Sequence, residues 1–289
     1  MVHYTYVTYQ STLDGNMGEY FNWVMVTPDR DTANTYFRAL QQYQTVSSSD
    51  VNGNPGAKYS FTSVDRFGPQ FWTYDSDSGE NFHLTARALC GNPKMKQVNP
   101  DFADVFGKIR VYWIGAYADG RFRTFFPGND GPGGQDDHDQ LSGDSFFVKR
   151  RGFNDYWYLS PGSSTVVLDS TRRSRFIFTV LLKSSETAYP KMPITDADQV
   201  KIEVIVSGVR IPIGTTSDNY LVAGTGLSQH TFTFRDLKTR FSLNDGSLKH
   251  PNGTTDDVSI VTWADTDSLG SADSFEIIDG TSLTESSDN

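Results

Sequence analysis

The sequence predicts a mainly β protein made of two β-sandwich-like antiparallel domains, with one short helix near residues 31–44. The 289-residue chain contains 20 Phe, 14 Tyr and 5 Trp, and aromatic and β-branched side chains favour strands. It also contains 25 Gly and 12 Pro, residues that form tight turns between short strands. Several segments alternate apolar and polar residues with the period of two that a half-buried strand requires.

The N-terminal domain is expected to span residues 1–190. The helix is predicted near 31–44, where Asp31 or Thr32 can cap its N-terminus and the apolar face recurs at helical spacing: Tyr36, Phe37, Leu40 and Tyr43. An Asp-Gly turn at residues 119–120 predicts a hairpin between two apolar segments. The strands of this domain are expected at residues 2–9, 20–26, 58–64, 69–74, 81–89, 108–117, 122–126, 146–150, 154–160 and 175–183.

Two stretches interrupt the strand pattern. Residues 127–145 form a long acidic loop, and loops of this length within a domain are usually functional or mobile. Residues 184–195 hold two prolines and are expected to link the domains. A C-terminal β-sandwich module would then fill residues 196–268, and residues 269–289 would form an acidic flexible tail.

Negative charge is concentrated at the C-terminal end. The chain has a net charge of −10, and residues 251–289 contain nine Asp or Glu but no Lys or Arg. No direct nucleic-acid binding is expected, because such binding needs a basic surface. Two interpretations of the acidic end remain open: a solvated tail, or a segment that docks on a basic partner surface.

Carboxylates are also clustered in the long acidic loop. The candidate metal ligands are Asp130, Asp136, Asp137 and Asp139. Calcium binds about six to eight oxygen atoms, which acidic loops can supply. Their spacing matches no EF-hand, so the cluster is interpreted either as a calcium site or as a solvated acidic turn. No other cofactor is expected.

Basic residues gather between positions 149 and 183. The candidate interaction residues are Arg150, Arg151, Arg172, Arg173 and Arg175. Such a cluster suits an anion or a neighbouring subunit, since opposite charges across a contact set its register and orientation. The alternative is neutralisation within the chain, by the acidic loop or the acidic C-terminal end.

No motif for catalysis stands out, and the protein is expected not to be an enzyme. The sequence lacks a Gly-x-Ser-x-Gly motif, a phosphate-binding loop and a dinucleotide fingerprint. Cys90 is the only cysteine, which excludes an intrachain disulfide. The N-terminus has no secretory-signal pattern, and no apolar run reaches the roughly 18–20 residues that span a bilayer. No membrane insertion is therefore expected.

Residues 199–263 show a distinctive order of strands and turns. A strand ending at Val-x-Gly-Val leads to an extended arm, an Asp-x-Tyr-x-Val-x-Gly-Thr turn, a Thr-Phe-Thr-Phe strand and a final Asp-x-Val-x-Ile strand. The matching positions are Val206, Gly208, Val209, Asp218, Tyr220, Val222, Gly224, Thr225, Phe232, Phe234, Asp257, Val258 and Ile260. This order resembles a small β module of bacteriophage tail and fibre-attachment proteins. It departs from that module at residues 235–255, which form a longer stretch than the pattern contains.

The resemblance implies a virion structural protein, made in the host cytoplasm, that acts by forming a homo-oligomer and contacting other virion proteins. The alternative is a calcium-assisted, lectin-like β-sandwich that binds a glycan through Trp72, Tyr74 and the acidic loops. A glycan-degrading hydrolase is a third interpretation.

Overall fold

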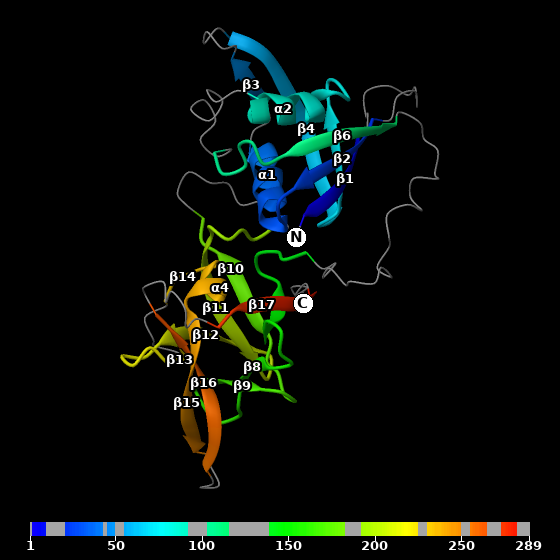
Figure 1. Ribbon diagram of the computed structural model, residues 1–289. Helices are drawn as coiled ribbons and strands as arrows, with labels where there is room; N and C mark the ends of the chain where they lie inside the picture. Colours follow the sequence, from blue (N-terminus) through cyan, green and yellow to red (C-terminus); the bar gives the residue numbers. More distant parts are fainter. Residues whose placement is uncertain are drawn as a thin grey trace, which may run out of the picture. The chain divides into compact units, whose positions relative to one another are not determined.

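The computed structural model describes residues 2–9, 21–42, 45–49, 55–91, 103–115, 139–182, 192–224, 230–249, 255–264 and 273–281. These residues are mostly in strands, which confirms the predicted fold class. The chain divides into two compact units, Met1–Asp139 and Gln140–Asn289 (Figure 1). The boundary thus precedes the linker expected at 184–195, and the expected division at residue 190 is wrong. Strands between 145 and 180 share a sheet with strands after 199 because their backbones pair across the expected linker.

The first unit is built on one six-stranded sheet with the order β3-β4-β5-β1-β2-β6. All its neighbouring strands are antiparallel except β1 and β5, which run parallel, so the sheet is mixed rather than purely antiparallel. The strands are β1 (His3–Tyr9), β2 (Asn22–Thr27), β3 (Thr45–Ser49), β4 (Pro55–Gly68), β5 (Phe71–Ser76) and β6 (Arg110–Gly115).

Two helices of this unit lie among the described residues. The helix predicted near 31–44 is confirmed as α1 (Arg30–Gln42), whose N-terminus is capped by Asp29 accepting a hydrogen bond from the Thr32 N–H at 2.8 Å. The strand predicted at 81–89 is wrong: this segment is α2 (Asn81–Gly91). None of the helices in the described ranges is long and apolar enough to cross a lipid bilayer.

The mistaken strand has a physical explanation. Apolar residues at positions 82, 84, 86 and 88 mimic the period of two, but Leu and Ala are good helix formers. The structure buries Phe82, Thr85 and Ala86, which are spaced three and four residues apart as on one helix face.

Both helices cover the same face of the first sheet. Phe37 of α1 packs edge-on against Trp72 of β5, with ring centroids 5.0 Å apart, and Phe82 of α2 packs against Tyr74 at 5.4 Å. The opposite face carries exposed aromatic side chains, including Tyr4, Phe71 and Tyr112. The core of this unit therefore lies between the sheet and its two helices.

The second unit contains a larger antiparallel sheet with the order β13-β12-β11-β10-β7-β8-β9-β16-β15. It curls, because bridges Thr165–Val222 and Tyr220–Thr262 bring β13 and its turn to β9 and β16, far along the strand order. The strands on this path are β7 (Ser145–Arg150), β8 (Tyr156–Leu159), β9 (Val166–Asp169), β10 (Phe176–Val180), β11 (Gln199–Val206), β12 (Val209–Thr215), β13 (Leu221–Ala223), β15 (Phe241–Lys249) and β16 (Thr255–Trp263).

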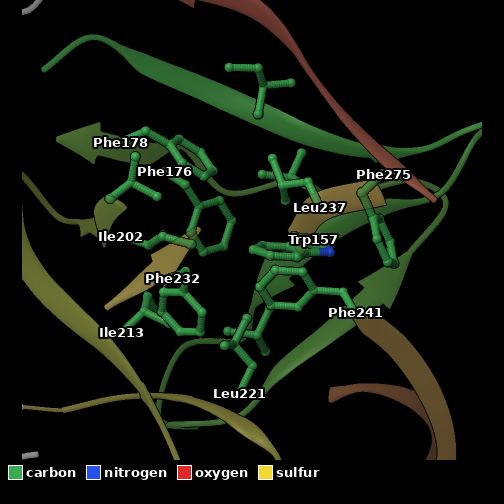
Figure 2. Packing of buried hydrophobic residues seen from close by; sticks show 14 of the residues in the cluster. Trp157, Phe176, Phe178, Ile202, Ile213, Leu221, Phe232, Leu237, Phe241 and Phe275 are labelled. Carbon is green, nitrogen blue, oxygen red and sulfur yellow. The ribbon is translucent and has the colours of Figure 1, made fainter. Parts of the chain in front are cut away.

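The curled sheet encloses a large aromatic core (Figure 2). Trp157 lies at its centre and makes edge-on contacts with three phenylalanine rings, those of Phe176, Phe241 and Phe275, at centroid distances of 5.0 to 5.6 Å. These rings come from four different strands, so burying them ties distant parts of the unit together.

The expected flexible tail, residues 269–289, contains a strand of this unit. Strand β17 (Phe275–Thr281) pairs antiparallel with β7. Phe275 and Ile277 are buried in the core, whereas Glu276 between them is partly exposed. Hydrophobic burial at alternate positions fixes this segment despite its acidic composition.

The described parts of residues 199–263 are mostly strands joined by turns. Ser207 and Gly208 join β11 to β12 with φ of 51° and 80°, the two positive values of a type I′ hairpin turn. Two further short elements lie in the described part of this unit: β14 (Phe232–Thr233), which pairs with β11, and α4 (Asp236–Thr239). The departure at 235–255 contains α4 and the edge strand β15.

Candidate functional site

Strands β7 and β8 present one aromatic and basic face away from the core. Phe146 and Val148 of β7 and Trp157 of β8 are buried inward. Because successive side chains of a strand point to opposite faces, Phe147 and Lys149 of β7 and Tyr156 and Tyr158 of β8 lie on the outer face, where they are partly exposed. Lys149 and Tyr156 are register partners, which aligns the two strands.

The segment after β9 brings three arginines to this face. Ser174 fixes the segment beside β8: its N–H donates to the Trp157 carbonyl at 3.1 Å, and its hydroxyl accepts from the Leu159 N–H at 3.0 Å. Arg173 and Arg175 flank this anchored serine and therefore project to the same side of an extended backbone. The local chain path thus positions both guanidinium groups.

Each of these arginines lies over an aromatic ring. The Cζ atom of Arg173 is 4.1 Å from the centroid of Phe147, and that of Arg175 is 4.4 Å from the same ring. Arg172 lies 4.6 Å from the ring of Tyr158. We name this surface the arginine–aromatic face; it consists of Phe147, Tyr156, Tyr158, Arg172, Arg173 and Arg175.

Stacking on aromatic rings holds these arginines in positions from which they can bind planar anions. Attraction between a guanidinium and a ring face holds the side chain in place. The five N–H donors of arginine lie in the guanidinium plane and match a carboxylate in a bidentate geometry. Arg175 uses one donor on the Ser145 carbonyl, at 3.1 Å, which further fixes its position.

A local ion pair holds one end of the face. Arg172 Nη2 lies 2.5 Å from Asp169 Oδ2. Burial alone would raise the pKa of Asp169, but hydrogen bonds from the Arg172 side chain and from the Thr171 and Arg172 backbone outweigh it and lower this pKa to about 2. The carboxylate therefore stays charged and holds Arg172 over Tyr158.

The other two predicted interaction residues pair within the chain. Arg150 Nη2 lies 2.7 Å from Asp273, and Arg151 Nε lies 3.7 Å from Glu276 of β17. Arg150 also stacks on Phe153, with its Cζ 4.1 Å from the centroid. Neutralisation by the acidic C-terminal end therefore applies to Arg150 and Arg151, because β17 pairs with β7.

Asp139 is the only one of the four candidate metal ligands among the described residues. It forms a salt bridge with the buried Arg66, and Arg30 Nη2 lies 3.6 Å from the same carboxylate. Asp130, Asp136 and Asp137 lie outside the described residues. Within the ranges that the structure describes, no group of three or more His, Cys, Asp or Glu is arranged to hold a metal.

The proposed glycan platform is not on the surface. Trp72 and Tyr74 are fully buried and pack against Phe37 and Phe82 of the helices. Alternation along β5 directs them to the helix-covered face, and burial raises the pKa of the Tyr74 hydroxyl. The carbohydrate-binding alternative therefore loses both residues that the sequence assigned to it.

The rings beneath the arginines were not identified as site residues from the sequence. Phe147, Tyr156 and Tyr158 fall in predicted strands and look like core residues when only their aromatic character is considered. The sequence feature that could have identified them is the alternation of inner and outer residues along a strand. Each of these rings lies one residue from a more strongly buried neighbour, so it occupies the outer face. Their pairing with Arg172, Arg173 and Arg175 depends on contacts between strands.

Comparison with known proteins gives no family. No family model matches the chain, and no curated protein matches it. Among solved structures it is similar to the binding domain of botulinum neurotoxin DC in complex with rat synaptotagmin II, at 9% identity and a TM-score of 0.35, covering 96% of this chain and 94% of that one. The binding domain of botulinum neurotoxin serotype D/C VPI 5993 gives 8% identity, a TM-score of 0.37, and coverage of 96% and 78%.

Proposed function

We propose that this chain is a non-enzymatic structural protein that acts by assembling with further copies of itself through the arginine–aromatic face. The observation that carries this function is the stacking of Arg173 and Arg175 on the single ring of Phe147. Arginine and aromatic side chains are enriched among the residues that dominate binding energy at protein interfaces. Stacking also orders the arginines before contact, which lowers the entropic cost of binding.

The chemistry of the face favours a protein partner that presents carboxylates. Guanidinium groups over rings offer both apolar contact and charged donors, as an interface centre requires. The chain as a whole is acidic, with a net charge of −10. Another copy therefore supplies many carboxylates for this basic face.

Assembly in a virion is the specific form of this proposal. It draws on the resemblance of residues 199–263 to a module of phage tail and fibre-attachment proteins. Contacts with other virion proteins would then extend the homo-oligomer. The virion form of the proposal adds a location and further partner proteins, and it keeps the arginine–aromatic face as the contact surface.

The mass of the protein in solution tests the function. Sedimentation velocity and light scattering over a range of concentrations should show oligomers for the wild type. Replacing Arg173→Gln and Arg175→Gln together should raise the dissociation constant at least about tenfold, since residues at an interface centre contribute about 2 kcal/mol or more each.

A matched variant controls for charge. Arg210→Gln with Arg235→Gln removes the same charge from two exposed arginines outside the face. This variant should assemble like the wild type. A wild type that stays monomeric at all concentrations, or a face variant that assembles as well as the control, would contradict the proposed function.

A further inference from the structure

The hairpin of β15 and β16 forms a ribbon that extends from the sheet (Figure 1). The two strands pair along their whole length, from Phe241–Trp263 to Lys249–Thr255. On its other side β16 pairs with β9 only at Ile260–Val167. Among the described residues, positions 255–259 thus have a strand neighbour on one side only. We name residues 244–249 and 255–259 the ribbon arm.

The ribbon arm lacks a core of its own. Asn244, Asp245 and Ser247 of β15 and Asp256 and Asp257 of β16 are exposed. Two-stranded ribbons are at best marginally stable alone in water. The outer edge of β15 also carries no paired strand among the described residues. The arm therefore gains stability when a partner surface covers it.

Carboxylates gather on one side of the arm. Asp245 is the register partner of Ser259, and Asp257 is the register partner of Ser247. Partners across a ladder share a face, and positions two apart on one strand do as well. Asp245 and Asp257 therefore project from the same face of the ribbon, close enough for one partner surface to contact both.

We infer that the ribbon arm of one copy docks on the arginine–aromatic face of a second copy. The two surfaces are complementary in charge: Asp245 and Asp257 meet Arg173 and Arg175. A ribbon is also a flat element whose polar groups can lie against half-buried rings. Because β16 is anchored in the sheet at Ile260 and Trp263, the arm continues away from its own sheet. The acceptor face therefore belongs to another molecule.

This pairing sets the symmetry of the assembly. The arm and the face are different surfaces, so the contact is heterologous. After the first contact the copy that supplied the arm retains its face, and the copy that supplied the face retains its arm. Unless two copies exchange arms reciprocally within one pair, such head-to-tail contacts produce rings or open polymers. The inference rests on the proposed function and names the partner of the same face.

A mixing experiment tests the arm directly. The arm variant carries Asp245→Asn and Asp257→Asn, and the face variant carries Arg173→Gln and Arg175→Gln. Each alone should show a dissociation constant at least tenfold above that of the wild type. Mixed in equal amounts, they should form a complex of two chains, twice 32.2 kDa, that grows no further. The intact arm of the face variant fills the intact face of the arm variant, and no second functional pair remains.

The control is Asp155→Asn with Asp218→Asn, which removes two carboxylates elsewhere in the second unit and should assemble like the wild type. Circular dichroism and thermal unfolding of every variant check that it is folded. If the arm variant assembles like the wild type while the face variant does not, the inference fails and the proposed function stands. If the mixture grows into large oligomers, the head-to-tail contact is wrong. A monomeric wild type would overturn both.

Discussion

The guanidinium of Arg173 lies over the ring of Phe147, with its Cζ atom 4.1 Å from the ring centroid. The same ring also supports Arg175, at 4.4 Å. Phe147 thus orders two cations, whereas Tyr158 supports one cation among the described residues, Arg172, which Asp169 already holds at 2.5 Å. The two rings therefore differ in their importance for binding.

Phe147→Leu should weaken self-association more than Tyr158→Leu. An exposed cation–π contact contributes about 0.5–1 kcal/mol, so losing two should raise the dissociation constant roughly 5- to 30-fold. Arg172 should keep its position through Asp169 when Tyr158 is replaced. Sedimentation velocity measures the dissociation constants, and thermal unfolding checks stability. Equal effects of the two substitutions would contradict the role of the shared ring.

A second prediction concerns the C-terminal strand. A chain ending at residue 272 lacks β17 and should lose much of the stability of the second unit, because Phe275 and Ile277 leave the core. The phenylalanine alone contributes about 3–5 kcal/mol in comparable cores. A chain ending at residue 281 retains every described residue of β17 and should unfold like the full chain. Urea unfolding measures both, and similar midpoints for the two truncations would show that β17 does not stabilise the unit.

Strand β17 also illustrates what the sequence predicts poorly. Phe275 and Ile277 alternate with Glu276 as in a strand, yet the surrounding acidic residues favour a solvated tail. This segment forms a strand because it pairs with β7, which lies more than a hundred positions earlier in the chain. The expected linker at 184–195 has the same limitation, since pairing of β10 with β11 joins the segments on either side of it.

The local pattern of apolar and polar residues predicts more reliably those elements that depend only on residues close together in the sequence. The helix α1 and strands β1, β2 and β7 follow their own periodicity. The arginine cluster is also visible in the sequence, because its members lie close together along the chain. Which rings and carboxylates each arginine contacts depends on sheet register, and the local sequence does not contain that information.

A third prediction concerns Arg66, whose side chain is only 2% exposed. Its Cζ atom lies 5.2 Å from the centroid of Phe37 and 5.8 Å from that of Trp72, and its charge is paired with Asp139. Asp139→Asn should destabilise the protein by about 3–5 kcal/mol, because it leaves a buried cation without its counterion.

The double variant Arg66→Met with Asp139→Asn should recover part of this loss. It removes the buried charge together with its partner and keeps an unbranched apolar side chain between the rings. Chemical denaturation of the single and double variants measures the difference. If the double variant is less stable than Asp139→Asn alone, the buried charge is not the source of the destabilisation.

The last prediction concerns pH and His3, which is buried at the start of β1. Its Nε2 lies 3.2 Å from the Pro69 carbonyl, to which the neutral ring can donate. Burial is the main cause that lowers the pKa of His3, and the charges of Arg30 and Arg66 lower it further. The Pro69 carbonyl and Asp29 oppose this shift only in part.

The sign of the effect follows from proton binding. The unfolded chain takes up a proton near pH 6.5, whereas folded His3 does so only at lower pH. Between these two values the unfolded state binds more protons, so stability falls as the pH falls. The loss is at most about 1.4 kcal/mol per pH unit, and it ends once the pH is below the folded pKa.

His3→Gln should reduce this loss, because glutamine keeps an N–H donor for Pro69 and does not titrate. Free energies of unfolding at pH 7.5, 6.5 and 5.5 should therefore decline less steeply for His3→Gln than for the wild type. The matched control is His83→Gln, which replaces a partly exposed histidine stacked on Trp23 at 5.2 Å. If His3→Gln and the wild type lose stability equally between pH 7.5 and 5.5, protonation of buried His3 does not destabilise the fold.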